Sequence, residues 1–199
     1  MKFKLQQLEK LRTKFVRDWV EPFLVAAFFA LCIIRPFIVE AYKIPTGSMR
    51  PTLLEGDLIF VNKFIHGARI PFTFVRLPAL RKPVRGEVIV FKYPVDPSKN
   101  YIKRLVGFPG ETVEIKNYTI YIDGRPLTDP PFGERAYYNR GSYGAEGVKI
   151  TVPKDSYFVL GDNSASSLDS RFWGFVPYKY LQGGAMVIWW PLSRIRIIR

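Results

Sequence analysis

Cysteine and histidine are almost absent from this 199-residue sequence, which has one of each, Cys32 and His66. A single cysteine excludes an intrachain disulfide, and the two residues together exclude a metal site built from cysteine and histidine. A Ser-His-Asp triad would have to use His66, and a cysteine nucleophile would have to be Cys32. The simplest interpretation is that His66 is a loop residue and that Cys32 fills space in an apolar helix. Much of the usual enzymatic repertoire is therefore excluded before any motif is considered.

Acidic residues are also few, with 17 Asp and Glu against 30 Lys and Arg, for a net charge of +13. With 48% apolar residues, the chain is too hydrophobic to be disordered. Its 16 prolines and 15 glycines follow no period, which excludes collagen and long coiled coils. This composition predicts one globular domain, rich in loops and β-structure, with an appendage.

Long uncharged apolar runs are limited to one, at residues 22–34. At 1.5 Å per residue this run covers roughly 20 Å, less than a hydrocarbon core of about 30 Å, so its length alone favours a signal-peptide core or a buried helix. A helix extended from Trp19 to Tyr42 would reach about 36 Å and would place both aromatic residues at membrane interfaces. We therefore expect residues 20–41 to form an uncleaved transmembrane anchor, with cleavage after Ala41 as the alternative.

Basic residues are distributed unequally around this run. Six lysines and arginines precede it, whereas only Lys43 and Arg50 lie in the 20 residues after Tyr42. Because positive charge is retained on the cytoplasmic side of a membrane, we expect residues 1–19 to be a basic cytoplasmic segment. Residues 42–199 would then form a domain on the extracytoplasmic face of the cytoplasmic membrane, periplasmic or outer.

The domain from Lys43 onward is itself basic, with 23 basic and 13 acidic residues. Such an excess is typical of a soluble surface or of contact with anionic lipid headgroups. No aromatic and basic motif of a nucleic-acid-binding module is present, and the expected side of the membrane holds no nucleic acid. We therefore expect membrane lipid as a partner, and not nucleic acid.

Short β-rich runs recur between turn signals after Tyr42, and no long stretch there has a helical period. The runs at 112–117 and 119–124 resemble a hairpin with a tight connection near Asn117. Residues 128–147 show no alternation and predict a surface excursion. The fold class is thus mainly β, an antiparallel domain behind one N-terminal helix. The expected strands are 57–64, 86–93, 101–106, 112–117, 119–124 and 156–161.

The first candidate for chemistry is the segment from Ile44 to Leu53, IPTGSMRPTL. Two prolines flank Gly47-Ser48, so Ser48 is expected in a stiff, exposed bend. A nucleophile needs a hydroxyl held at a fixed point beside a backbone N–H that can receive an oxyanion, and Thr46 can supply a second donor. The alternative is an ordinary turn capped by serine and threonine.

The second candidate is the segment YIKRLVGFPGE, from Tyr101 to Glu111. Strand alternation sends Lys103 and Arg104 to opposite faces, with Lys103 on the face of Tyr101 and Leu105. Desolvation can lower a lysine pKa by several units. A buried Lys103 beside Ser48 would then be a general base that needs no histidine. The alternative is two surface basic residues on an edge strand.

The third candidate is GDNSASSLDSR, residues 161–171, which is unusually rich in polar groups. Asp162 and Asp169 are natural partners for Arg104 and Arg171, and Ser167 can orient an amine by hydrogen bonding. A calcium loop is the alternative, because the Asp-x-Asn-x-Ser spacing is rich in oxygen. No bidentate glutamate closes that loop and Arg171 would repel a cation, so we expect no metal.

The order SMRPTL, KRLVGFPGE and GDNSASSLDSRFWGFVP behind an N-terminal apolar helix closely resembles the type I signal peptidases of bacteria. The resemblance runs from the anchor to about Gly184 and is weakest between 126 and 154. One departure is Glu111, where the family usually has aspartate in a turn. The lysine also matters for subtype, since eukaryotic-type relatives have histidine at the position of Lys103.

The resemblance implies a role for each matching residue. Ser48 matches the acylated nucleophile, Lys103 the general base and Ser167 the serine that positions the lysine. Thr46 matches the hydroxyl that completes the oxyanion hole with the Ser48 N–H. Further charged residues match pairs that brace the site; these are Asp169 with Arg171 and Asp162 with Arg104. No cofactor is implied.

The resemblance also implies the domain plan and the substrate. The family fold is a β-rich catalytic core, here about 42–106 and 156–199, with a variable β region inserted at about 107–155. The family removes signal peptides from secreted preproteins and reads small residues at −1 and −3, as expected of an extended substrate whose alternate side chains face the enzyme. Alternatives are a dedicated maturase with the same dyad, or an inactive lipid-binding β module. The pocket residues expected near −1 are Ile44, Met49, Leu53, Tyr101 and Ile102, and those near −3 are Tyr42 and Ile44.

Overall fold

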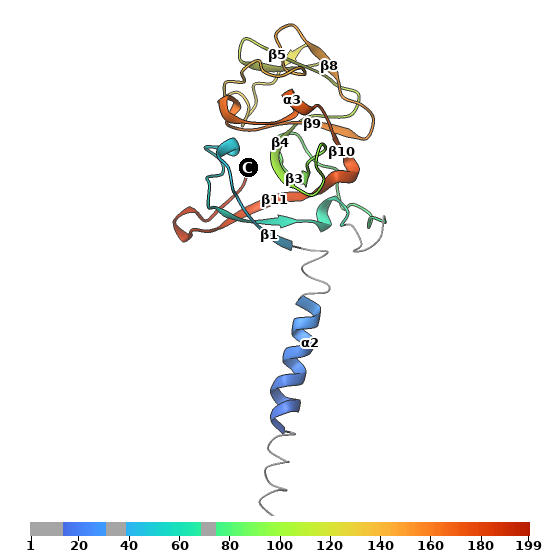
Figure 1. Ribbon diagram of the computed structural model, residues 1–199, viewed down its shortest axis with the longest axis vertical. Helices are drawn as coiled ribbons and strands as arrows, with labels where there is room; N and C mark the ends of the chain where they lie inside the picture. Colours follow the sequence, from blue (N-terminus) through green and yellow to red (C-terminus); the bar gives the residue numbers. More distant parts are fainter. Residues whose placement is uncertain (1–13, 31–38, 69–74) are drawn as a thin grey trace, which may run out of the picture.

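The computed structural model describes residues 14–30, 39–68 and 75–199. It contains an N-terminal helical segment, which includes α2, and a β domain. The helical segment lies apart from the sheets (Figure 1). Their elements are η1 (Val16–Val20), α2 (Glu21–Phe29), β1 (Val39–Lys43), η3 (Gly47–Met49), β2 (Leu58–Asn62), η4 (Phe64–His66), β3 (Val88–Lys92), β4 (Asn100–Gly107), β5 (Thr112–Lys116), β6 (Thr119–Ile122), β7 (Arg125–Pro126), β8 (Lys149–Thr151), β9 (Ser156–Leu160), η5 (Ser164–Ser166), α3 (Ser170–Trp173), β10 (Val176–Pro177), η6 (Tyr178–Tyr180), β11 (Leu181–Trp190), η7 (Leu192–Arg194) and β12 (Arg196–Ile197).

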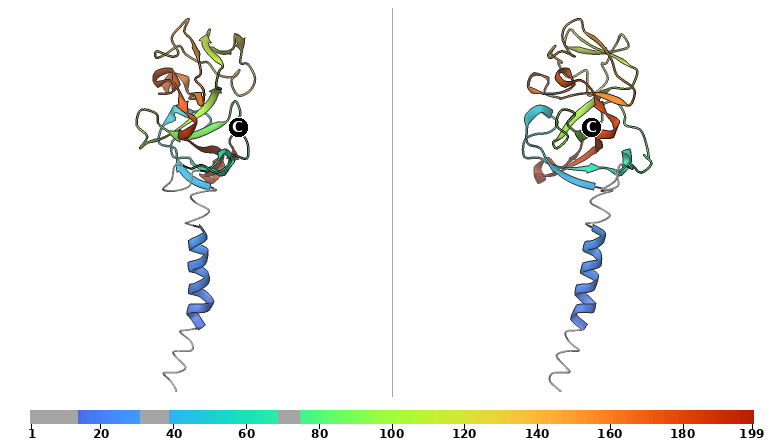
Figure 2. Two further views of the ribbon diagram at one scale, coloured as in Figure 1. Left: turned by 90° about the vertical axis from the view of Figure 1, so that its right-hand side faces the viewer. Right: turned by 45° about the vertical axis from the view of Figure 1, so that its right-hand side comes forward.

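The strands form two antiparallel sheets. The larger sheet has eight strands in the order β1-β2-β11-β3-β4-β9-β10, with β12 paired to β11. The smaller sheet has the order β7-β6-β5-β8 and lies within the stretch between β4 and β9. The views in Figures 1 and 2 agree in placing β1 at one end of the domain and the smaller sheet at the opposite end. The expectation of a mainly antiparallel β fold is confirmed.

The six strands expected from the β-rich runs are all present, as β2, β3, β4, β5, β6 and β9. The hairpin between β5 and β6 turns on Asn117 and Tyr118, which have φ angles of 49° and 60°. Two successive positive φ angles are the signature of the tight turn that matches strand twist. Glu111 also shapes a turn, because its carboxylate accepts the Phe108 N–H at 2.7 Å.

The chain from Val39 to Lys43 departs from the expected helix. It forms β1, antiparallel to β2, with Val39 opposite Asn62 and Lys43 opposite Leu58. A continuous helix from Trp19 to Tyr42 is therefore wrong, and an anchor ending at residue 41 overlaps the sheet. The segment pairs along its whole length with β2, and its polar Glu40 forms an ion pair at 2.6 Å with Lys63, the residue that follows β2.

The helical segment is described only up to residue 30. Within the described ranges, the chain has no helix of the length and apolar character that a membrane crossing requires. Cys32, expected to fill space in an apolar helix, and most of the link between α2 and β1 lie outside the described residues.

The largest strand missed from the sequence is β11, which crosses the middle of the larger sheet. It contains Gly183 and Gly184, a pair that usually indicates a turn. Here the glycines allow close approach, since a Cβ on Gly183 would lie 2.3 Å from the Asn62 carbonyl oxygen and one on Gly184 would lie 2.4 Å from Glu87 Oε1. Irregular register beside Val187 and Trp190 further obscures the alternation.

Residues 127–148 contain no helix or strand, as expected, but they are not a purely surface excursion. Phe132 and Tyr137 are buried in the core beneath the smaller sheet, with Val113 and Ile115 of β5. The loop is therefore packed against the domain, and its polar residues are held in fixed positions.

Candidate active site

Ser48 lies in the short helical turn η3, directly after an extended residue, Thr46, with φ of −138° and ψ of 156°. Pro45 and Pro51 bracket the turn, as the sequence predicts. The first N–H groups of a helical turn have no partner within the turn, which leaves the Ser48 N–H free of intrahelical bonding beside its own hydroxyl. The serine is nevertheless mostly covered, at 8% exposed.

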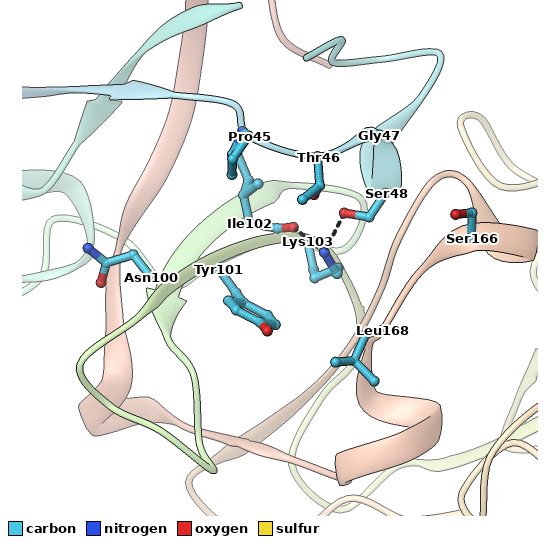
Figure 3. A pocket seen from close by; sticks show the side chains of 10 residues that line it. All are labelled: Pro45, Thr46, Gly47, Ser48, Asn100, Tyr101, Ile102, Lys103, Ser166 and Leu168. Atoms are coloured by element: carbon cyan, nitrogen blue, oxygen red, sulfur yellow. Dashed lines mark hydrogen bonds between the residues drawn. The ribbon is translucent and has the colours of Figure 1, made fainter. Parts of the chain in front are cut away.

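Lys103 reaches the same point from β4, which carries it into the domain. Its Nζ lies 2.7 Å from Ser48 Oγ and donates to the Ile102 carbonyl at 2.9 Å. The amine also lies 5.6 Å from the centre of the Tyr101 ring, and the side chain is only 4% exposed. Figure 3 shows the side chains of Ser48, from the turn, and Lys103, from the strand, pointing toward each other.

Burial lowers the pKa of Lys103 to about 8, because desolvation penalises the charged ammonium. The negative charges of Asp169 and Asp162 act in the opposite direction and partly offset this effect. The amine therefore titrates near neutral pH, where a general base is most effective.

A cavity of about 430 Å³ opens beside the pair. One wall is an edge of β4 with no partner among the described strands. Along Asn100–Arg104, β4 pairs with β3 on one side, but it pairs with β9 on the other side only from Arg104 onward. The opposite wall is the extended chain before Ser48. The cavity is thus bounded by two extended segments, which is the shape that accepts a peptide in β-conformation. Its lining residues are Pro45, Thr46, Gly47, Ser48, Asn100, Tyr101, Ile102, Lys103, Ser166 and Leu168.

Of the residues expected to contact substrate, only Tyr101 and Ile102 line this cavity. Ile44, Met49 and Leu53 are at most 2% exposed and lie in the core with the apolar side chains of β2. Tyr42, on β1, packs against the same core. Their apolar character reflects packing beneath the bend, so the structure does not place these four on the cavity wall.

Arg104 points away from Lys103, as alternation predicts, and pairs with Asp162. Its Nε and Nη2 donate to the two carboxylate oxygens at 2.7 and 2.6 Å, and Nη1 donates to the Gly86 carbonyl at 2.5 Å. Both side chains are almost completely buried. Thr52 completes the group, since its hydroxyl donates to Asp162 and accepts from Arg104 Nη2 at 3.3 Å.

Arg171 and Asp169 form a second buried pair. Two guanidinium nitrogens bind the two carboxylate oxygens, each at 2.8 Å, and neither side chain is exposed. Asp169 also accepts the Gly161 N–H at 3.0 Å, while Arg171 binds the hydroxyl and carbonyl of Ser164. The pair therefore fixes the loop that carries the third motif.

Ser167 lies in that loop, 6% exposed, and its hydroxyl has no hydrogen-bond partner among the described residues. It lies close to the bend, because a Cβ built on Gly161 would be 2.1 Å from Ser167 Oγ and 2.5 Å from the Ser48 carbonyl oxygen. The expected hydrogen bond to Lys103 is not formed here, and the amine binds the Ile102 carbonyl instead.

Asn163 is a site residue that the sequence interpretation missed. Its backbone N–H donates to the Ser48 carbonyl and its Nδ2 to the Gly47 carbonyl, both at 3.1 Å. Asn163 thereby ties the third motif to the catalytic bend. The signal in the sequence is the place of Asn163 within a polar segment, after Asp162 and before four serines. The sequence indicates the side-chain chemistry of this segment but not its backbone hydrogen bonds.

Two further expectations concern residues outside the pocket. His66, expected to be a loop residue, ends the short helical turn η4 and is buried, and its Nε2 lies 2.9 Å from Glu87 Oε1. In the part of the chain that the structure describes, no group of three or more His, Cys, Asp or Glu side chains is arranged to hold a metal ion.

A serine hydroxyl in contact with a buried amine, beside an unpaired strand edge that can receive a peptide, defines a serine endopeptidase. A family model described as "Signal peptidase, peptidase S26" matches residues 16–190. The chain belongs to this family.

Individual relatives agree with the family model. A signal peptidase I of Pseudomonas aeruginosa is 36% identical over 197 residues, covering 82% of this chain and 69% of its own. A signal peptidase I of Bacillus licheniformis is 33% identical and covers 90% of this chain and 91% of its own. A crystal structure of a signal peptidase I from Enterococcus faecalis is 36% identical and covers 52% of this chain and 97% of that chain, with a TM-score of 0.43.

Proposed function

We propose that the protein is a membrane-anchored serine endopeptidase that removes N-terminal signal peptides from exported preproteins. The observation that carries the proposal is the 2.7 Å contact between Ser48 Oγ and Lys103 Nζ in a cavity bounded by extended chain. The relatives named signal peptidase I support the class of substrate. Cleavage is expected after a small residue at −1, with another small residue at −3.

In the acylation step, neutral Lys103 accepts the proton of Ser48 Oγ, and the oxygen attacks the carbonyl carbon of the −1 residue. The negative charge that develops on the carbonyl oxygen is stabilised by the Ser48 N–H and the Thr46 hydroxyl, each contributing about 3 kcal/mol. The tetrahedral intermediate then breaks its C–N bond. Lys103 gives its proton to the departing amine, which becomes the N-terminus of the mature chain.

In the deacylation step, Lys103 accepts a proton from water, and the hydroxide attacks the Ser48 ester. The ester C–O bond breaks, Ser48 recovers its proton, and the signal peptide leaves with a new carboxylate. Ser167 is assigned to orient the Lys103 amine during the cycle. The pairs Arg104–Asp162 and Arg171–Asp169 are assigned to hold the surrounding loop.

The substrate lies extended along the edge of β4 that faces away from β3, where no strand of the described residues pairs with Asn100–Lys103. Alternate side chains of an extended peptide face the same side, so positions −1 and −3 point at the enzyme and −2 points away. Tyr101 and Ile102 limit the size of the −1 side chain.

A preprotein with alanine at −1 and −3 is expected to be cut between −1 and +1, and one with leucine at −1 at least about a hundredfold more slowly. The physical reason is steric, because Ile102 is held by core packing and cannot move aside. Mass spectrometry of the products identifies the cut bond. Equal rates for the two substrates would contradict the assignment of the pocket, and an uncut alanine substrate would contradict the proposed function.

The cleavage rate is expected to rise with pH and to level off above a midpoint near pH 8. Only neutral Lys103 can accept the serine proton, and the pKa of this amine is lowered to about 8. Between pH 6 and pH 9 the neutral fraction increases roughly 90-fold. The measurement is kcat/KM for one peptide across this range, because it reports the free enzyme. A rate that is constant from pH 6 to pH 9 would show that Lys103 is not the titrating base.

We further assign α2, with the residues that follow it up to β1, to a single membrane anchor. The described helix carries exposed apolar side chains such as Trp19, Phe23 and Leu24, at 59–71% exposed. Lipid would cover these side chains, because apolar surface of this size is unfavourable in water. The basic N-terminal segment would then be cytoplasmic and the β domain extracytoplasmic, next to the membrane that its substrates cross.

A further inference from the structure

Arg135 reaches the active-site network from the loop between β7 and β8, far from the three motifs in sequence. Its Nη2 donates to Thr52 Oγ1 at 3.1 Å and lies 3.5 Å from Asp162 Oδ2. Its Nη1 binds the Pro131 carbonyl of the same loop. The side chain is only 15% exposed, so this cation is held inside the domain.

Thr52 is the residue through which this contact acts. A threonine hydroxyl has one hydrogen to donate and two lone pairs to accept. In this structure it donates to Asp162 and accepts from Arg104 at 3.3 Å and from Arg135 at 3.1 Å. All three hydrogen-bonding positions are therefore used, and the loss of Arg135 would leave one of them without a partner.

The two residues that Arg135 contacts lie next to the reacting groups along the chain. Thr52 is four residues after Ser48 in the same bend. Asp162 precedes Asn163, whose N–H donates to the Ser48 carbonyl. A shift of either residue would therefore move the serine hydroxyl relative to the Lys103 amine.

The loop is fixed at a second point, which keeps Arg135 in place. The Tyr138 N–H donates to Ser164 Oγ at 2.9 Å, and the Tyr138 carbonyl accepts from Arg171 Nη1 at 2.8 Å. The loop thus contacts both buried ion pairs, Arg135 at one and Tyr138 at the other. Side chains held by two independent contacts of this kind position a site precisely.

We propose that Arg135 is a positioning residue of the active site, which holds Ser48 through Thr52 and sets the charge around Lys103 through Asp162. The inference rests on the proposed function. Under this proposal, the loop at 127–148 supports the active site in addition to packing against the smaller sheet.

The electrostatic part of the proposal has a definite sign. Asp169 and Asp162 are the carboxylates that act on Lys103, and each is paired with a buried arginine. Arg135 is a second cation at Asp162. Removing a positive charge from this group favours the charged ammonium, so the pKa of Lys103 would rise and a higher pH would be needed for activity.

The test uses the full chain in detergent micelles and compares Arg135→Met with Arg140→Met. Arg140 is an exposed residue of the same loop, so its replacement removes the same charge without touching the network. Arg135→Met is expected to lower kcat at pH 7 about tenfold and to move the rise of the pH profile to higher pH, with KM little changed. Arg140→Met is expected to match the wild type, and Arg135→Lys to keep the wild-type pH profile.

Thr52 supplies the second arm. Thr52→Val removes the hydroxyl at constant shape and is expected to lower kcat, whereas Thr52→Ser restores it. If the action passes through Thr52, adding Arg135→Met to Thr52→Val lowers kcat by less than the product of the two single effects. This arm also decides the matter if Arg135→Met does not fold, because full activity of Thr52→Val would then overturn the proposal.

Each remaining outcome has a distinct meaning. If Arg135→Met has the kcat and pH profile of Arg140→Met while Ser48→Ala is inactive, the positioning role is overturned and the proposed function stands. A lower kcat with an unmoved pH profile also overturns the proposal, because a purely structural role predicts it. If Ser48→Ala still cleaves, the proposed function itself fails.

Discussion

The Lys103→Met protein is expected to fold and to cleave preprotein at least about a thousandfold more slowly than the wild type. Methionine has a similar length and is apolar, so it fills the space of a side chain that is 4% exposed. It has no lone pair that can take the proton of Ser48 Oγ, which lies 2.7 Å from the amine it replaces. The measurement is single-turnover cleavage of a preprotein at pH 8.

The same variant is expected to be more stable at pH 7, by up to about 3 kcal/mol. Burial lowers the pKa of Lys103 to about 8. The charged ammonium is therefore less favourable in the folded state than in the unfolded state, and this difference is a penalty on folding. This penalty is fully present below pH 8 and is lost as pH rises to the unfolded pKa near 10.4. Urea unfolding at pH 7 and at pH 10.5 tests the sign, and a gain that persists at pH 10.5 would contradict this explanation.

Lys103→Arg is the matched control. Arginine keeps the positive charge at every accessible pH and cannot act as a base. We expect this variant to be inactive like Lys103→Met, but without the gain in stability. Cleavage by Lys103→Arg at near the wild-type rate would show that a charge at this position is sufficient and would remove the general-base role.

Arg171→Met is expected to lower the free energy of unfolding by about 3–5 kcal/mol, a large part of the stability of an ordinary domain. The substitution leaves the Asp169 carboxylate in a position with no exposure and without its cation. It also removes hydrogen bonds to Ser164 and to the Tyr138 carbonyl. Thermal or urea unfolding followed by circular dichroism measures the loss.

The exposed pair Lys99–Asp96 provides the control for this prediction. Its side chains are 65% and 39% exposed, and ion pairs of this kind contribute about 1 kcal/mol or less. Lys99→Met should therefore change stability little. Adding Asp169→Leu to Arg171→Met should destabilise less than the two single effects together, because no unpaired charge is left. Additive losses would contradict the explanation by charge burial.

The strands that could be predicted from sequence are β-rich runs between turn signals. Some, such as β9, are buried throughout, and others alternate between core and surface. The pattern of β2, with Ile59 and Val61 buried between half-buried neighbours, is of this kind. Strand β11 could not be predicted, because its glycines, which usually indicate a turn, here allow close approach to Asn62 of β2 and to Glu87. The sequence does not show that these residues are neighbours. Strand β1 was assigned to a helix because it follows an apolar run, and its partner lies some 20 residues further along the chain.

At the site, the reacting residues and the pairs Arg104–Asp162 and Arg171–Asp169 could be proposed from the sequence, whereas Asn163, Thr52 and Arg135 could not. Ser48 and Lys103 have few alternatives in a chain with one histidine and one cysteine. Asn163, Thr52 and Arg135 act through hydrogen bonds across long sequence separations, such as the 83 residues between Thr52 and Arg135. Apolar character alone also does not separate a pocket wall from a core: the sequence predicts Met49 and Leu53 near the −1 position, and the structure places both in the core.

The serine and the lysine that meet in this structure are 55 residues apart in the chain, and the loop that holds them follows later still. A nascent or unfolded chain therefore has no nucleophile, and hydrolysis begins only when the distant strands have associated. Until it has folded, the chain does not cleave other polypeptides, including unfinished copies of itself, during its own synthesis and export. The rate of peptide cleavage consequently counts the molecules that have completed folding, so refolding can be followed by enzymatic turnover.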